Sequence, residues 1–158
     1  MSRFSGKLDN GDGDHVRATR SVRCVLTGQA SGTTATFDLE ALLAAQGGPA
    51  LLANHKIVGA HLECETALTF TGGDTTGVTA VVGISGTLNG FLTTAAITSL
   101  AAGDVSDLGG AGSLVGRARA STTALLTITA TGGAPDVEDI ATGVVWVHLE
   151  VKKLKERV

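Results

Sequence analysis

The clearest pattern along the chain is an alternation of apolar and polar side chains with a period of two residues. It is most regular in KIVGAHLECETALTF (residues 56–70). One face of this segment is largely apolar and consists of Val58, Ala60, Leu62, Cys64, Thr66 and Leu68. The other face consists of Gly59, His61, Glu63 and Glu65. This period is typical of a half-buried antiparallel strand, so we expect one face to lie on the core and the other in water.

The same period recurs twice further along the chain. In VTAVVGI the residues expected to face inward are Val78, Ala80, Val82 and Ile84. In TGVVWVHLEVKK they are Val145, Val147, Leu149 and Val151, and the opposite face carries Val144, Trp146, His148, Glu150 and Lys152. Shorter apolar segments predict further strands over residues 22–27, 33–37, 114–120 and 124–130.

Helix and turn signals divide these strands. FDLEALLAAQGG predicts a short helix in which Asp38 caps the start, Leu39, Leu42 and Leu43 share a face, and two glycines end it. TGGDTTG and SGTLNGF are interpreted as turns, and TTAAITSLAAG as a short helix or an irregular crossover. Residues 1–20 are polar, rich in Gly and Asp and without periodicity.

About seven strands with short helical crossings indicate an all-β fold, an antiparallel β-sandwich or a jelly roll with one or two short helices. We expect an extended N-terminal arm over residues 1–20 and a single sandwich domain over residues 21–158. The chain of 158 residues is 43% hydrophobic but only 3% aromatic, so Val, Leu, Ile and Ala must build the core. No apolar run approaches the roughly 18 residues of a membrane span, and from the polar first residues we expect no signal peptide.

Charge is unevenly distributed along the chain. Residues 1–24 carry a net charge of +2, residues 146–158 also +2, and the acidic middle −7. Basic ends on an acidic body suggest termini that contact acidic neighbours, including other copies of the chain, although solvated tails give the same pattern. No basic stripe with interleaved aromatics is present, so we expect no nucleic-acid binding.

Candidate metal and catalytic motifs do not match the spacing that their chemistry requires. DNGDGDH (residues 9–15) lacks the glycine and the closing glutamate of an EF-hand loop, and PDVEDI is interpreted as a solvated acidic loop. GISGT and AGSLV do not complete a nucleophile elbow, and no phosphate-binding loop occurs. We therefore expect no enzyme activity, no metal and no cofactor.

The cysteines and histidines offer no obvious dyad. His61 and Cys64 are an odd number of residues apart on one strand, so they must point to opposite faces. Cys64 belongs to the apolar face and is interpreted as a buried, inert side chain. His61 and His148 point outward, and although two histidines on neighbouring strands could bind zinc, no third or fourth ligand is evident.

Trp146 is the most informative single residue, because it is the only tryptophan and the alternation places it on the face opposite the core. Such a residue either anchors an interface or belongs to a second core beneath the helix or the arm. The candidate interface residues are Trp146, Val144, His148, Arg3, Lys7, Arg17 and Arg20.

With these strands in place, the chain resembles a known class of proteins. The segments that carry the resemblance are IVGAHLECETALTFTGGDTTGVTAVVGISGTLNGFLTTAAI, GSLVG, LLTITATGG and TGVVWVHLEV. In style and order they are similar to the small β-sandwich structural proteins of tailed-bacteriophage virions, over roughly residues 56–151. Residues 1–55 carry no such resemblance.

The resemblance implies a structural protein of a phage particle, assembled in the host cytoplasm and located in the virion. It implies a capsid decoration (cement) protein that acts as a homotrimer, contacts the major capsid protein or other virion subunits, and clamps neighbours with its arm. A tail, head–tail connector or fibre-base protein is the alternative within this class. A carbohydrate-binding β-sandwich module is a second alternative, although one Trp and no Tyr poorly supply a stacking platform. The resemblance implies no catalytic residues.

Overall fold

The computed structural model describes residues 15–51, 55–106, 111–117 and 123–154. Two long strands, β3 (His55–Phe70) and β8 (Ile140–Leu154), dominate the fold. The other strands are β1 (His15–Val25), β2 (Thr34–Asp38), β4 (Thr75–Ile84), β5 (Thr87–Ala96), β6 (Val105–Ser106) and β7 (Leu125–Gly132). The described helices are α2 (Leu39–Ala45) and the single-turn 3₁₀ helix η1 (Val137–Asp139). Within these ranges, no helix is long and apolar enough to cross a membrane.

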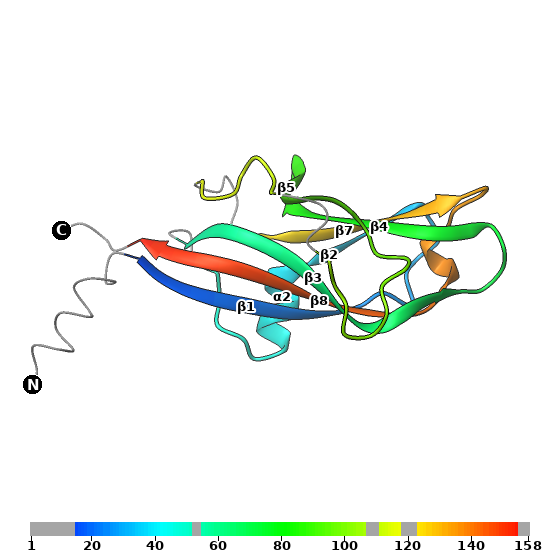
Figure 1. Ribbon diagram of the computed structural model, residues 1–158, viewed down its shortest axis with the longest axis horizontal. Coiled ribbons are helices and arrows are strands. Elements are labelled where there is room, and N and C mark those ends of the chain that lie inside the picture. The colour runs from blue at the N-terminus through cyan, green and yellow to red at the C-terminus, as the bar shows by residue number, and fades with distance from the viewer. Residues whose placement is uncertain (1–14, 52–54, 107–110, 118–122, 155–158) are drawn as a thin grey trace, which may run out of the picture.

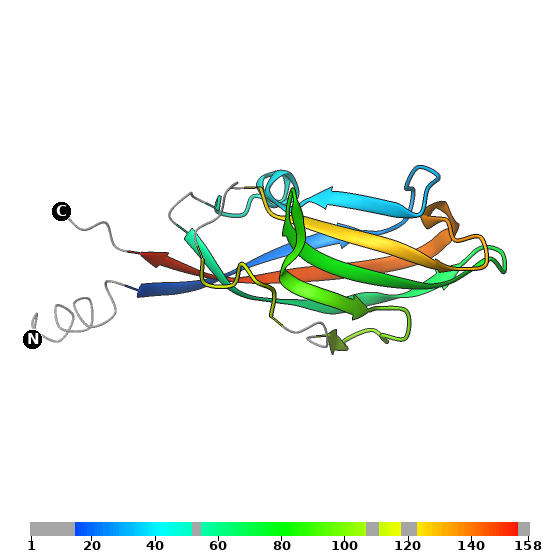
Figure 2. The same ribbon diagram turned by 90° about the horizontal axis from the view of Figure 1, so that it is seen from above.

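The strands form two antiparallel sheets that pack face to face (Figures 1 and 2). Sheet A has the strand order β1-β8-β3-β6 and sheet B the order β2-β7-β4-β5. The expected all-β sandwich is therefore confirmed. β1 begins and β8 ends at the same end of the molecule, and the β3–β4 turn and η1 lie at the opposite end (Figure 1).

The inner faces of the two sheets build the core from aliphatic side chains. On β8 the expected alternation is confirmed, because Val145, Val147 and Leu149 are fully buried and Val151 nearly so. The inward residues of β4 and β7 lie in the same buried cluster and include Val78, Ala80, Val82, Leu126 and Ile128. Burial of this apolar area is the main favourable term in folding.

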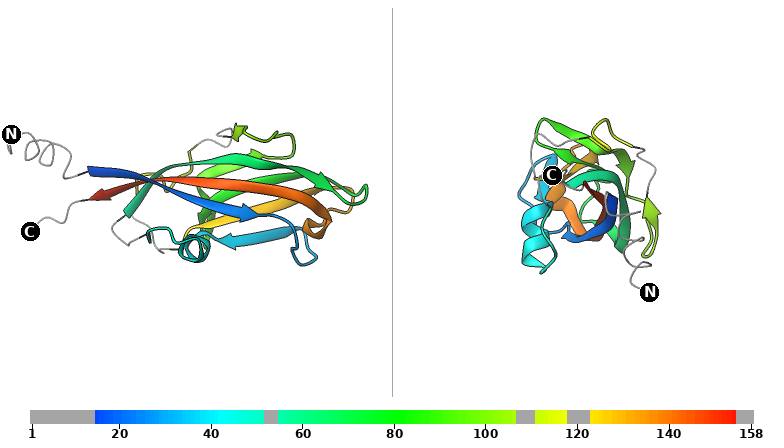
Figure 3. Two further views of the ribbon diagram at one scale, coloured as in Figure 1. Left: turned by 90° about the horizontal axis from the view of Figure 1, so that it is seen from below. Right: turned by 90° about the vertical axis from the view of Figure 1, so that its left-hand side faces the viewer.

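Helix α2 forms where the sequence predicted it. Asp38 caps it, accepting a hydrogen bond from Ala41 N at 2.9 Å, and Leu39 and Leu43 are buried. The helix lies at the flank of the sandwich beside the edge strand β1 (Figure 3).

Three expectations about local structure are wrong. SGTLNGF is a turn only at Ser85 and Gly86, where the positive φ of Gly86 allows the chain to reverse tightly. β5 follows at once and includes residues 93–96, the start of the segment expected to be a short helix or an irregular crossover. The irregular pairing of β5 with β4, with register shifts on both sides of Val82, hides the two-residue period. The rest of that segment, residues 97–103, forms turns that lead from sheet B to β6 in sheet A, in agreement with the second alternative.

The strand expected over residues 114–120 is also wrong for the part that the structure describes. Residues 113–116 form turns, and residues 118–120 lie outside the described ranges. Leu114 N donates to Gly90 O at 2.8 Å, and Gly116 N donates to Ile57 O at 2.8 Å. These isolated bonds reach two different strands, so the segment does not join a ladder.

The sheet begins earlier than expected. Residues 15–20, expected to lie in the arm, belong to β1 and pair with β8 from His15↔Leu154 onward. Their polar sequence concealed the strand, because the pairing comes from backbone groups that composition does not reveal. Residues 1–14 lie outside the described ranges.

Candidate functional site

The outer face of sheet A holds both ion pairs and both ring contacts found among the described residues. Strand pairing places Arg23 beside Trp146 and Trp146 beside Glu63, and it places Ser21 beside His148 and His148 beside His61. Together with Glu65 these residues are called the outer cluster. Its members are Ser21, Arg23, His61, Glu63, Glu65, Trp146 and His148.

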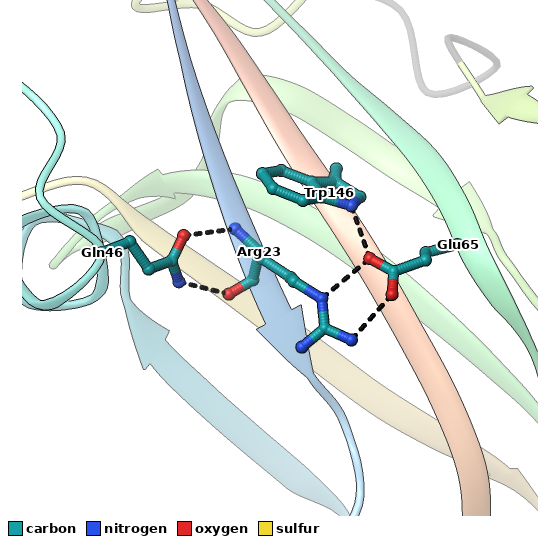
Figure 4. Close-up of polar contacts among 4 residues, drawn as sticks. All are labelled: Arg23, Gln46, Glu65 and Trp146. Carbon is teal, nitrogen blue, oxygen red and sulfur yellow. Dashed lines mark hydrogen bonds and ion pairs between the residues drawn. The ribbon is translucent and has the colours of Figure 1, made fainter.

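One half of the outer cluster is organised around Glu65 (Figure 4). Arg23 donates to both carboxylate oxygens, from Nε at 2.8 Å and from Nη2 at 2.7 Å. Trp146 Nε1 donates to Oε2 of the same carboxylate at 2.6 Å. The hydrogen bonds and charge of Arg23, with the bond from Trp146, hold the pKa of Glu65 below its usual value. The carboxylate therefore stays ionised and fixes the indole and the guanidinium against one another.

Arg23 is also held through its backbone, which links the cluster to α2. Gln46, which ends the helix, accepts from Arg23 N at 3.0 Å and donates to Arg23 O at 2.8 Å. The side-chain amide of Gln46 thereby satisfies the backbone N–H and C=O of Arg23 on the free edge of β1, as a neighbouring strand would.

The second half of the outer cluster is organised around His148. Its Nδ1 lies 2.8 Å from Ser21 Oγ, and its Nε2 lies 2.7 Å from Glu63 Oε2. Its ring stacks on His61 with centroids 4.8 Å apart and lies nearly parallel to Trp146, with centroids 6.5 Å apart. Three rings and two anchoring carboxylates therefore share one face of the sheet.

Serine, histidine and carboxylate in this order resemble the connectivity of a hydrolase triad. However, acyl transfer also requires N–H donors that converge on the developing oxyanion. Ser21 lies within the extended strand β1, where successive N–H groups point in opposite directions within the sheet. The backbone beside this hydroxyl therefore supplies no converging pair of donors, and the arrangement is better suited to fixing side chains than to acyl transfer.

The structure places the predicted interface residues at different depths. Trp146 and His148 lie on the outer face with partly exposed side chains, whereas Val144 is 9% exposed. Arg17 and Arg20 belong to β1, and Arg3 and Lys7 lie outside the described residues.

Arg20 does not share the outer face. It alternates with Ser21 and Arg23 along β1, and its Nε is buried with no hydrogen-bond partner among the described residues. Its parity with the buried Val22 and Cys24 explains this position, because side chains two residues apart on a strand share a face. An interface role for the seven predicted residues stays a prediction.

Sequence reasoning missed Ser21, Arg23, Glu65 and Gln46 as partners. The alternation did place Glu63 and Glu65 on the outer face, opposite the core. No local signal showed that β1 and β8 would lie in register with that strand.

The predicted separation of His61 from Cys64 is confirmed, because Cys64 is fully buried on the inner face and His61 lies on the outer face. Cys24 and Cys64 lie in one row on either side of Val145. Two strand spacings, about 9.5 Å, separate them, which is too far for a disulfide. Burial raises the pKa of Cys24 to about 12, and burial followed by the Asp104 charge raises the pKa of Cys64.

Acidic loops do not combine into a metal site in the described parts of the chain, where no group of three or more His, Cys, Asp or Glu could hold an ion. Asp136 accepts hydrogen bonds from Ser31 Oγ, Gly32 N and Glu138 N. These bonds hold its pKa below its usual value and use its carboxylate to close loops. The loop at residues 9–14 lies outside the described residues.

Comparison with known proteins finds similarity among solved structures. No protein-family model and no curated protein matches the chain. A chain of the solved structure described as "Cyanophage Pam1 capsid asymmetric unit" matches with a TM-score of 0.55 and 16% sequence identity. The match covers 89% of this chain and 86% of that chain. At this identity, the comparison shows a shared fold.

Proposed function

We propose that this chain is a structural protein of a phage particle. The observation that carries the proposal is the fold match to a chain of a phage capsid, which extends over 89% of this chain and 86% of that one. A match over nearly the whole of both chains indicates a shared domain rather than a shared motif. The coarse resemblance of residues 56–151 to virion β-sandwiches, which rests on the sequence alone, points to the same class.

Within this class we propose a decoration (cement) protein that binds the shell as a homotrimer. Its contacts would be with the major capsid protein and with its own copies, after assembly in the host cytoplasm. Many copies of a modest contact stabilise a shell effectively, because each engaged copy raises the effective concentration of the next contact.

We propose the outer cluster as the surface that contacts the shell. Glu65 fixes the indole of Trp146, and Ser21 and Glu63 fix the imidazole of His148. A partly exposed aromatic side chain that is already held in place loses little conformational entropy on binding, which is typical of an interface hot spot. The same organisation favours a non-catalytic role, because both side chains are committed to internal hydrogen bonds.

The first experiment measures where the chain is and in how many copies. Particles of the phage that encodes it would be purified, and the chain quantified against the major capsid protein by mass spectrometry with labelled peptides. Hundreds of copies per particle would support decoration, and a few to dozens would support the tail, connector or fibre-base alternative. Absence of the chain from intact particles would contradict the proposal.

The second experiment tests the surface. Particles lacking the chain would be titrated with the wild-type protein and with Trp146→Ala. Loss of a hot spot of about 2 kcal/mol weakens binding about 30-fold. Trp146→Phe keeps a ring but loses the bond to Glu65, so it separates the contact from its positioning. Leu88→Ala is the matched control, because Leu88 is 41% exposed and lies on sheet B. Equal binding by Trp146→Ala and wild type would place the contact elsewhere.

A further inference from the structure

Strand register gathers basic residues at one end of sheet A, where β1 begins and β8 ends (Figure 2). Lys152 lies directly opposite Arg17 on one side and Lys56 on the other. Lys153 follows Lys152 in β8. Arg117 is exposed, and it lies near the same end because its neighbour Gly116 donates from N to Ile57 O at 2.8 Å. This set, called the basic end, is Arg17, Lys56, Arg117, Lys152 and Lys153.

Lys56, Arg117 and Lys152 of the basic end form no ion pair with another described residue. The ion pairs among the described residues are Arg23–Glu65 and His148–Glu63, so neither Lys56 nor Lys152 forms one with a described residue. Both lysines are partly exposed, and the acid nearest in register is Glu150, opposite Gly59. Like charges directly opposite each other weaken a sheet. The repulsion between Lys56 and Lys152 is therefore not offset by an ion pair within the described residues.

The opposite end of the molecule is acidic. Asp74, Asp136, Glu138 and Asp139 lie there, in the β3–β4 turn and in and beside η1. Gly133 N donates to Asp74 O at 3.0 Å, and Thr71 N donates to Asp139 O at 2.7 Å, so the two segments are joined. Residues 66–103 and 123–145 contain no Lys or Arg. This set is called the acidic end.

Two acids of the acidic end accept hydrogen bonds from neighbouring segments, and the other two do not. Asp136 and Asp139 accept hydrogen bonds from Ser31 and Thr75, which uses them to close loops. Asp74 and Glu138 are exposed, and their carboxylates form no hydrogen bond or ion pair with another described residue. These two acids are therefore available to a partner and can be replaced without breaking a loop.

The two ends cannot neutralise one another within one molecule. Ile140 and Lys152 mark them on β8, and at about 3.3 Å per residue they are roughly 40 Å apart. That distance is about five Debye lengths at physiological salt, so the charges at one end are screened from those at the other. Opposite charges on two molecules can approach without this limit.

We infer that copies of this chain associate head to tail, with the basic end of one copy on the acidic end of the next. The occupant of the basic end is a second copy, because the fold itself carries the complementary charges. The contact is heterologous, so repeated use either closes a ring or forms an open row. The inference goes beyond the proposed function and holds whether or not the chain belongs to a particle.

Charge reversal tests the contact in the full chain. The mass of the wild type would be measured by light scattering as a function of concentration, at about 20 mM and about 500 mM salt. We expect the mass to rise with concentration at low salt and to return to that of the smallest unit at high salt. Lys56→Glu with Lys152→Glu should abolish the rise, as should Asp74→Lys with Glu138→Lys. An equimolar mixture of the two double variants should restore it, because their altered ends are again complementary.

Further variants keep the inference falsifiable. If the reversed variants fail to fold by circular dichroism, Lys56→Gln with Lys152→Gln gives the milder form, for which we expect at least a tenfold weaker association. Its matched control is Thr34→Glu with Thr94→Glu, which changes the net charge equally at exposed positions on sheet B and should leave association unchanged. Association that is absent in the wild type, or that survives both reversals, would overturn the inference. The inference would also be overturned if the basic end bound a labelled single-stranded nucleic acid of about 20 nucleotides while Asp74→Lys with Glu138→Lys self-associated like the wild type.

Discussion

Leu149 offers the most direct test of the division of β8 into a core face and an outer face. Its side chain is fully buried, and its backbone lies between Arg20 of β1 and Ala60 of β3. Strands on both sides restrict collapse around a cavity. Leu149→Ala should therefore lower the free energy of unfolding by about 3 kcal/mol, within the usual range of about 2–5 kcal/mol. In a domain of this size the melting temperature should fall by about 6–12 °C.

The assay is urea unfolding followed by the fluorescence of Trp146, with calorimetry for the melting temperature. The matched control is Glu150→Ala, one residue further along the same strand. Glu150 is exposed and its carboxylate makes no hydrogen bond or ion pair with another described residue, so its replacement should change stability by no more than about 0.5 kcal/mol. Equal effects of the two substitutions would refute the alternation on β8. They would also remove the reason for placing Trp146 and His148 on one outer face.

Three further outcomes are expected. Burial raises the pKa of Cys24 to about 12 from 9.0 and also raises that of Cys64. At pH 8 the smaller thiolate fraction alone should slow the reaction of Cys24 with a disulfide reagent roughly 1000-fold relative to a thiol of pKa 9.0. Two rapidly reacting thiols in the native protein would contradict this. The lowered pKa of Asp136 means that its stabilisation is present at neutral pH and is lost as pH falls through its folded pKa, below 3.8. Acid titrations between about pH 5 and 2 should therefore show a smaller loss of stability in Asp136→Asn than in wild type, and parallel curves would exclude this role. Gly83→Ala should destabilise by about 2 kcal/mol or more, because its Cβ would lie 2.1 Å from a backbone oxygen of β5, whereas Gly73→Ala has open space and should change the midpoint of urea unfolding little.

Patterns within single strands were predicted most reliably from the sequence. The period of two residues identified the core and outer faces of β8 and of β3 between residues 60 and 64, because alternation depends only on the geometry of one extended segment. It was wrong at the register shifts of β3, where Ile57 rather than Val58 is buried and Thr66 is exposed. The cap at Asp38 was likewise found, since it acts within one turn of its helix.

Segments whose structure depends on a distant partner were predicted less well. β5 looked like a turn and a crossover because register shifts beside Val82 break its period. Residues 15–20 looked like an arm because their strand is defined by hydrogen bonds to β8 rather than by their own composition. Both errors concern pairing, which a single segment does not encode locally.

The sequence by itself determined the all-β class, the aliphatic core and the outward position of Trp146 and His148. Only the tertiary structure decided which side chains meet there. Ser21 and His148 are 127 residues apart in the sequence, and Arg23 reaches Glu65 across β8. The register of three strands brings them together, and that register is fixed by backbone hydrogen bonds and core packing over the whole sheet. The same register brings Arg17, Lys56 and Lys152 of three strands together at one end of the molecule, which charge counted along the chain could not show.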